Sequence, residues 1–269
     1  MKIALAPIAL RDYRNNPNAS GYKEGIKTML RRVKDIGYDG IEMGTPTGFT
    51  HEEYKEYMDG LGLQVVSAGT PGILDKEDLS GAIEQCKILG AKNVMISNPT
   101  PVVLGNPYEL EQFIGKLNRV GKALIAEGIH LSYHNHAIDF SKVNGKTILD
   151  HIVEGTEPGS VFFEPDTHWI QAGGGHVITW LKKLKGRMYM VHFKDYGIDP
   201  YSDHVFLEGT HKLFMEVGEG NLNWPGIIAE CKAQGIEWCA AEQDICRRPA
   251  YESIAISLNN LRGFMSAAG

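Results

Sequence analysis

The sequence predicts an α/β protein that folds as a single (β/α)8 TIM barrel over residues 1–269. Three observations support this fold class. The chain is long enough for one large core, with 43% hydrophobic residues. A unit of helical stretch, glycine turn and short apolar strand recurs along it. No low-complexity linker or change of composition divides the chain.

Glycine turns mark the repeated unit, as in "DIGYDGIEMG" and "GLGLQVVSAG". Glycine just past a helix end is expected because it adopts the left-handed conformation that terminates the helix. The turn glycines are Gly37, Gly62, Gly90, Gly128, Gly159, Gly186 and Gly235. The strands that follow them, with one more at the N-terminus, make about eight, the number a closed parallel barrel needs. An open doubly wound sheet is the alternative, but no GxGxxG follows the first strand.

The elements follow in order along the chain. "MKIALAPIAL" predicts a buried first strand rather than a secretory leader, because Pro7 interrupts the apolar run and "RDYRNN" follows it. Helices are expected over 20–36, 51–60, 78–90, 107–127, 146–154, 176–184, 224–234 and 250–265. The 107–127 helix has the clearest apolar face, formed by Leu110, Phe113, Leu117, Val120, Leu124 and Ile125. Tyr196 to Asn223 is expected to be a long loop that covers a site.

Composition excludes several kinds of partner. The formal net charge is −6 and the pI is about 5.9, so nucleic acid is not expected as a partner. No apolar run approaches the ~20 residues of a membrane helix. The cysteines form no CxxC pair and indicate reduced thiols in a cytoplasmic protein; they are Cys86, Cys231, Cys239 and Cys246. Cys246 follows a strand near the expected site and is assigned no role. A homo-oligomer is compatible with the sequence.

Polar side chains end four consecutive predicted strands, "LSYHNH", "VFFEPD", "MYMVHFKD" and "WCAAEQD". Barrel active sites lie at the carboxyl ends of the strands, and residues two apart in a strand point to the same side. Four residues that can bind metal share this inward parity: His134, Asp166, His192 and Glu242. Two imidazoles and two carboxylates suit one divalent ion, with Mn2+ the first choice and Mg2+, Co2+ or Zn2+ as alternatives.

Other polar residues at these ends are candidates for catalysis or substrate binding. Glu242, Lys194 and His136 are the predicted catalytic residues, although His136 could be an ordinary loop histidine. Lys194 is predicted to stabilise an oxyanion or protonate a leaving hydroxyl; the alternative is an ion pair with Glu164 or Glu42. Glu42, Glu164 and Trp169 are the predicted substrate-binding residues. For Trp169 the expected role is stacking on a sugar face, and the alternative is packing.

The motifs "YHNH", "DTHW", "VHFKD", "VGEG" and "EQD", in this order, resemble those of the xylose isomerase-like barrels. That family includes the sugar phosphate isomerase/epimerase group, the inosose dehydratases and endonuclease IV. The resemblance covers nearly the whole chain, is strongest over 130–244, and is especially close to inosose dehydratase in "VHFKD", "EVGEGNLNW" and "AEQD". It implies that strands five to eight each supply one metal ligand, namely His134, Asp166, His192 and Glu242, and that Glu242 is the base.

Two departures from the family pattern limit this resemblance. Epimerases of the group place a glutamate where His134 stands, so a symmetric mechanism with two glutamate bases is not expected. Endonuclease IV needs a histidine three residues after Asp166, where this chain has Trp169, and His168 lies one residue early on the opposite side. With the acidic net charge, this disfavours a nuclease.

The first functional prediction is a divalent-metal-dependent sugar isomerase or epimerase. It would act on an unphosphorylated keto-sugar or related polyol through an enediolate. The alternative is a dehydratase of the inosose dehydratase type, a carbon–oxygen lyase, because the same enediolate can expel a β-hydroxyl. A non-catalytic sugar-binding barrel and an endonuclease IV-like nuclease are less favoured. No phosphate-binding loop is evident, since the glycines around "VGEGN" are too sparse.

Overall fold

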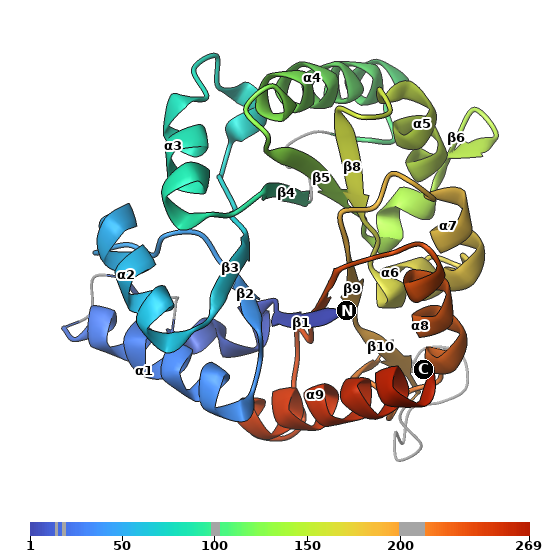
Figure 1. Cartoon of the computed structure of the whole chain (residues 1–269). Helices are drawn as coiled ribbons and strands as arrows, with labels where there is room; N and C mark the ends of the chain where they lie inside the picture. The colour runs from blue at the N-terminus through green and yellow to red at the C-terminus, as the bar shows by residue number, and fades with distance from the viewer. Residues whose placement is uncertain (14–15, 18–19, 98–102, 199–212) are drawn as a thin grey trace.

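The computed structural model describes residues 1–13, 16–17, 20–97, 103–198 and 213–269. A ring of helices surrounds a barrel of short parallel strands, which confirms the predicted (β/α)8 fold (Figure 1). The barrel strands are β1 (Lys2–Leu5), β2 (Gly40–Glu42), β3 (Gln64–Ser67), β4 (Asn93–Ser97), β5 (His130–His134), β8 (Val161–Glu164), β9 (Met190–Phe193) and β12 (Trp238–Ala241).

Two parallel sheets together close the barrel. One has the strand order β3-β2-β1-β12-β9 and the other β4-β5-β8. The Ala68 N–H donates to the Asn93 carbonyl at 2.9 Å, which joins the β3 and β4 edges. On the other side, parallel bridges pair Phe163 with Met188 and Asp166 with His192. Every strand therefore has its carboxyl end at the same rim of the barrel.

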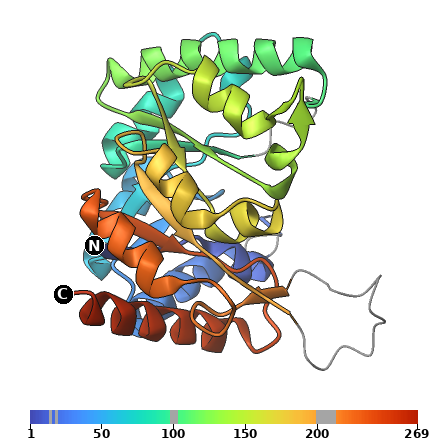
Figure 2. The same ribbon diagram turned by 90° about the vertical axis from the view of Figure 1, so that its right-hand side faces the viewer.

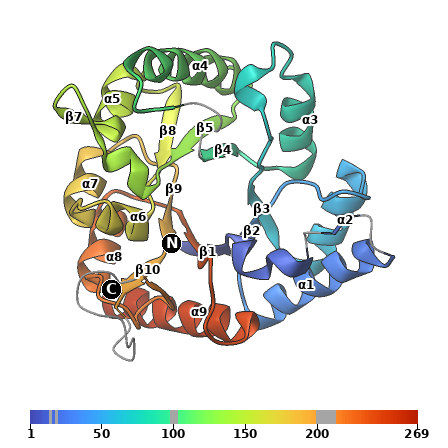
Figure 3. The same cartoon turned by 180° about the vertical axis from the view of Figure 1, so that it is seen from behind.

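The helices predicted from the sequence are all present, with bounds within two residues of those expected. They are α1 (Tyr22–Ile36), α2 (His51–Leu61), α3 (Ser80–Leu89), α4 (Pro107–Ile125), α5 (Ile148–Gly155), α7 (Val177–Lys183), α8 (Trp224–Ala233) and α9 (Ala250–Ala267). The first and last helices meet where the guanidinium of Arg32 lies 3.7 Å from the ring centre of Tyr251, which completes the ring seen from behind in Figure 3.

Short helices that the sequence did not predict also occur. The helix α6 (Thr167–Ala172) starts directly after β8, and its six residues are too few to show an apolar period. Asp166 is its N-cap, because one of its side-chain oxygens accepts the N–H of Trp169 at 2.7 Å. Short 3-10 helices are η1 (Pro7–Tyr13), η2 (Ile73–Asp75) and η3 (Ala137–Phe140).

The predicted turn glycines all have positive φ, between 64° at Gly62 and 113° at Gly37. Each follows the helix it was expected to end, or precedes the next strand, so the repeat read from the sequence is confirmed. The apolar face of α4 is also as predicted: its residues are buried except Ile125, which is half-buried.

Apolar side chains fill the lower part of the barrel. Met190 and Ala240 belong to a small buried cluster that also contains Ala4, Ala6, Val66 and Trp238. Met190 and Ala240 precede His192 and Glu242 by two residues. Because residues two apart in a strand point to the same side, His192 and Glu242 also point inward, one layer nearer the carboxyl rim. The remaining core lies between the strands and the outer helices.

The connection after β9 departs from the predicted loop. Its described ends form an antiparallel ribbon of β10 (Asp195–Gly197) and β11 (Leu213–Met215), seen at the right-hand end of the barrel in Figure 2. Residues 199–212 of the predicted loop lie outside the described residues. A second small hairpin, β6 (Lys142–Val143) with β7 (Lys146–Thr147), precedes α5.

Asp195 anchors this ribbon and explains the "VGEG" motif structurally. Its carboxylate accepts the N–H groups of Gly218 at 2.8 Å and Gly220 at 3.1 Å, and the indole N–H of Trp224 at 2.6 Å. A side chain at Gly220 would collide with this carboxylate. The motif therefore holds the connection against the barrel end.

Among the described residues, every helix is too short or too polar to cross a membrane.

Candidate metal centre

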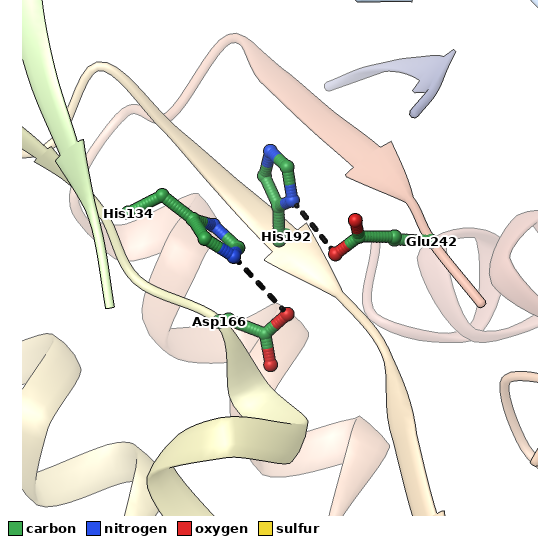
Figure 4. A group of neighbouring side chains, drawn as sticks. All are labelled: His134, Asp166, His192 and Glu242. Carbon is green, nitrogen blue, oxygen red and sulfur yellow. Dashed lines mark hydrogen bonds and ion pairs between the residues drawn. The ribbon is translucent and has the colours of Figure 1, made fainter. Parts of the chain in front are cut away.

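The structure brings the four predicted metal-binding residues together at the carboxyl rim of the barrel (Figure 4). His134 ends β5, Asp166 follows β8, His192 lies in β9 and Glu242 follows β12. Each offers one ligand atom, and these atoms lie within 4.8 Å of one another. The side chains are buried, and only Glu242 retains some exposure, at 12%. The four residues predicted from strand parity therefore lie together in the structure. Their role as metal ligands stays a prediction.

Asp166 presents one oxygen to this cluster and uses the other to hold its own position. Its Oδ1 accepts the Trp169 N–H, and its backbone N–H donates to the Asn135 side-chain oxygen at 3.1 Å. Its Oδ2 is buried and has no hydrogen-bond partner among the described residues. This oxygen lies 3.9 Å from Nε2 of His134. Nζ of Lys194 forms an ion pair with this oxygen at 3.6 Å, but a buried carboxylate oxygen without a hydrogen-bond donor still suits a metal cation.

Both ring nitrogens of His192 face carboxylates. Its Nδ1 lies 3.2 Å from Glu242 Oε2, on the side of the cluster. Its Nε2 lies 2.8 Å from Glu42 Oε2 and 3.3 Å from Glu164 Oε2. With Nδ1 as the ligand atom, the proton sits on Nε2 and faces these carboxylates. Carboxylates placed behind a histidine in this way orient it and strengthen its bond to a metal.

Glu42 and Glu164, both predicted to bind substrate, take up different positions. Glu42 lines a cavity of about 660 Å3 onto which His192 and Glu242 also open. Glu164 is fully buried behind His192 and accepts a hydrogen bond from the Asn93 side chain. Substrate contact remains a prediction for both residues, and the geometry favours it at Glu42 only.

Lys194 is buried within a group of carboxylates. Its Nζ lies 3.2 Å from Glu242 Oε2 and 3.6 Å from Asp166 Oδ2, and it forms an ion pair with Asp244. These partners differ from Glu42 and Glu164, which sequence reasoning considered. Asp244 was missed as a partner, although it shares the parity of Glu242 and so points to the same side.

Aromatic rings form one wall of the site. Nζ of Lys194 lies 4.8 Å from the ring centre of Trp169 and 5.2 Å from that of Phe214 in β11. The rings of Trp169 and His136 have centres 5.4 Å apart. His168, as expected, is on the opposite side, with its Nδ1 2.7 Å from the Asp195 carbonyl oxygen. Phe214 could not be placed from the sequence, because only the pairing of β10 with β11 brings it here.

Burial and neighbouring charges favour different protonation states for the four residues of the cluster. Burial lowers the pKa of His134 well below its usual range, so this imidazole is neutral. Burial raises the pKa of Glu242, but Lys194 and His192 outweigh it and hold that pKa well below its usual value. Burial raises the pKa of Asp166, whose free oxygen has no hydrogen-bond donor among the described residues. A divalent cation at that oxygen would offset this cost by favouring the ionised form.

The residues present fit a divalent ion. Burial lowers the pKa of His192, but Glu42, Glu164 and Glu242 outweigh it and raise that pKa, so a metal ion would take the place of a proton on this imidazole. Two neutral imidazoles and two carboxylates would then balance a 2+ charge, and the buried Asp166 Oδ2 lacks a hydrogen-bond partner among the described residues. The mixture of nitrogen and oxygen donors suits Mn2+, Co2+ or Zn2+ better than an ion that requires oxygen donors alone.

Replacing Glu42 with glutamine is expected to weaken metal binding by about tenfold to a hundredfold, because the charge that polarises His192 is lost. Titration with a competing chelator would measure the affinity. Glu52→Gln, at an exposed position on α2, is the matched control and should bind metal normally. Unchanged affinity in Glu42→Gln would contradict the orienting role of this carboxylate.

An eight-stranded parallel barrel with convergent metal-binding side chains at its carboxyl rim defines the class of protein: a TIM barrel with an enzyme-like site. A family model described as the xylose isomerase-like TIM barrel matches residues 30–257. The chain therefore belongs to the xylose isomerase-like TIM barrel family, as the sequence motifs indicated.

Two of the relatives below carry the names of enzymes. An inosose dehydratase from Mesomycoplasma hyopneumoniae is 26% identical, over 99% of this chain and 97% of its own length. Among solved structures, a sugar phosphate isomerase/epimerase from Parabacteroides distasonis superimposes with a TM-score of 0.76 at 21% identity, covering 98% of this chain and 95% of its own. The IolI protein, solved with a bound zinc atom, has a TM-score of 0.67 at 16% identity and covers 100% and 99%. At these identities the structural neighbours define the fold.

Proposed function

We propose that His134, Asp166, His192 and Glu242 hold one divalent ion, and that the protein is a dehydratase acting on a keto-polyol or keto-sugar. One observation carries the proposal. Glu242 belongs to the ligand group, lines the cavity and is kept ionised by Lys194 and His192. An ionised carboxylate beside a Lewis acid and an accessible cavity suits removal of a proton next to a ketone.

Proton removal is assigned to Glu242. The bound ion, when present, supplies a Lewis acid for the ketone oxygen and a neighbouring hydroxyl. Glu242 takes the proton from the carbon beside the ketone, and the C–H electron pair forms the new double bond. Proximity compensates for the reduced basicity of this carboxylate.

Departure of the β-hydroxyl is assigned to the side chains beside Glu242, where Nζ of Lys194 lies 3.2 Å from Glu242 Oε2. The C–O bond breaks, its electrons stay on oxygen, and a proton from the ammonium of Lys194 converts it to water. Burial lowers the pKa of Lys194, but Asp166, Glu242 and Asp244 outweigh it and raise that pKa, so the ammonium form persists. Lys194 can therefore donate hydrogen bonds to developing negative charge throughout the reaction. Burial lowers the pKa of His136, which favours its neutral form.

A dehydratase is favoured over an isomerase by the ligand group and by the relatives. His134 is a neutral imidazole where a two-base epimerase would need a carboxylate. A relative that spans almost the entire chain is named an inosose dehydratase. The second candidate is an isomerase or epimerase, supported by Glu42, a carboxylate that lines the same cavity as Glu242 and could return a proton.

Proton NMR in D2O distinguishes these reactions directly. The metal-loaded protein would be incubated with a panel of inososes, ketoses and glycosides of keto-sugars. Loss of water supports the dehydratase, deuterium incorporation with a changed ring configuration supports the epimerase, and no exchange with any compound supports a non-catalytic binding barrel.

Replacing His134 with glutamate is expected to lower turnover by about tenfold or more, equivalent to ~1.4 kcal/mol of transition-state stabilisation. The added negative charge would weaken the Lewis acidity of the ion. Kinetics and metal content would be measured on the same preparation. A fully metallated His134→Glu protein with equal or higher turnover would instead indicate a two-base epimerase.

We further propose a cytoplasmic enzyme that acts on small molecules. The cysteines are free, with Cys86, Cys231 and Cys239 buried, which suits a reducing compartment. A homo-oligomer also remains a prediction, which light scattering would test.

A further inference from the structure

A buried polar network lies inside the barrel next to the candidate metal centre. Its four side chains come from four strands and have an exposed fraction of 0%: Ser67 in β3, Asn93 in β4, Ser132 in β5 and Glu164 in β8. Ser132 and Glu164 precede His134 and Asp166 by two residues, so they point into the barrel one layer below these predicted ligands. The network therefore adjoins the metal centre without belonging to the four predicted ligands.

Asn93 joins the members of this network and has a fixed orientation. Its Oδ1 accepts a hydrogen bond from the Ser132 hydroxyl at 2.7 Å. Its Nδ2 donates to Ser67 Oγ at 3.0 Å and to Glu164 Oε1. An amide rotated by half a turn would place its oxygen against the Glu164 carboxylate, so the observed orientation is the one that satisfies this neighbour. Asparagine is disfavoured in strands and costly to bury, which indicates a role for this amide beyond packing.

The carboxylate of Glu164 is held by Asn93 at one oxygen and faces His192 with the other. Its Oε2 lies 3.3 Å from Nε2 of His192, and Oε2 of Glu42 lies 2.8 Å from the same nitrogen. Two carboxylates at one ring nitrogen repel each other, and Glu164 is the more buried of the two. Without the Asn93 amide, Glu164 would lose a hydrogen-bond donor and could rotate away from His192.

We infer that Asn93 is a positioning residue for the metal centre. By holding Oε1 of Glu164 it directs Oε2 to Nε2 of His192, and this leaves Nδ1 of His192 facing the ion. The inference rests on the proposed function for the presence of the ion, whereas the network itself is a property of the barrel. Loss of an outer partner of a metal-binding histidine is expected to lower metal affinity about tenfold or more.

Replacing Asn93 with leucine tests this role on the Co2+-loaded full chain, because leucine has a similar size but no amide. Co2+ affinity is measured by competition with a chelator, and the visible absorption of the bound Co2+ reports the geometry of its ligands. We expect an affinity loss of about tenfold and a changed Co2+ spectrum. Asn260→Leu is the matched control. It removes a hydrogen bond from α9 to the Val217 carbonyl, outside the metal centre, and should leave both readouts unchanged.

A second background shows whether Asn93 acts through Glu164. In the Glu164→Leu protein the carboxylate is already absent, so adding Asn93→Leu should cause no further loss of affinity. Thermal unfolding checks each variant, and Asn93→Ala replaces Asn93→Leu if the latter does not fold. Native affinity and spectrum in Asn93→Leu, or an equal further loss in the Glu164→Leu background, would overturn the inference and leave the ligand group in place. Native protein that binds no Co2+ would overturn the ligand group, and the inference with it.

Discussion

Replacing Asp166 with alanine is expected to reduce metal affinity by more than about a hundredfold and to abolish turnover, while the barrel stays folded. The change removes the buried oxygen that has no hydrogen-bond partner among the described residues and leaves the apolar core untouched. It also removes the N-cap of α6, so a loss of about 0.5–2 kcal/mol in the free energy of unfolding is expected. Metal content by atomic emission and unfolding by circular dichroism would be measured together.

Asp150→Ala is the matched control for this experiment. Asp150 belongs to the capping box of α5 and lies outside the candidate metal centre, so its replacement should cost stability and leave metal binding intact. A fully metallated Asp166→Ala protein would exclude the proposed ligand group. Metal absent from the native protein after incubation with Mn2+, Co2+ and Zn2+ would do the same.

Replacing Glu242 with glutamine is expected to slow proton exchange at the substrate carbon by about 10²- to 10⁴-fold while the ion is retained, although more weakly. The amide oxygen can still coordinate, but the amide cannot accept the proton. Exchange is followed by NMR in D2O, with metal content measured on the same sample. This separates the role of Glu242 as base from its role as ligand.

Glu237→Gln is the control for the second experiment, because Glu237 is exposed and precedes the same strand, β12. It should exchange at the native rate. Native exchange in Glu242→Gln itself would place the base elsewhere, with His136 or Lys194 as the next candidates.

Much of the site followed from local sequence patterns. Turn glycines such as Gly62 and Gly128 fix where helices end, because positive φ is a property of a single residue. Strand parity fixes the side to which His134, His192 and Glu242 point, because alternation depends only on neighbouring residues. A closed parallel barrel then brings residues of the same parity to one rim.

Other features depended on contacts between distant segments. Parity places Lys194 inside the barrel but does not choose among the carboxylates there; the structure pairs it with Asp166, Glu242 and Asp244. The short helix α6 has no periodic signal and depends on its cap at Asp166. The pairing of β10 with β11 places Phe214 beside Lys194, although residues 199–212 separate these strands in sequence.

The sequence by itself therefore determined the (β/α)8 barrel, the positions of its turns and the convergence of four ligand-type side chains at one rim. Only the tertiary structure decided that Glu42 and Glu164 face Nε2 of His192, and that a cavity of about 660 Å3 opens beside Glu242. The physical reason is that conformation and side-chain direction are set by residues adjacent in the chain. The partner of a buried charge and the shape of a cavity are set by residues that meet only when the barrel closes.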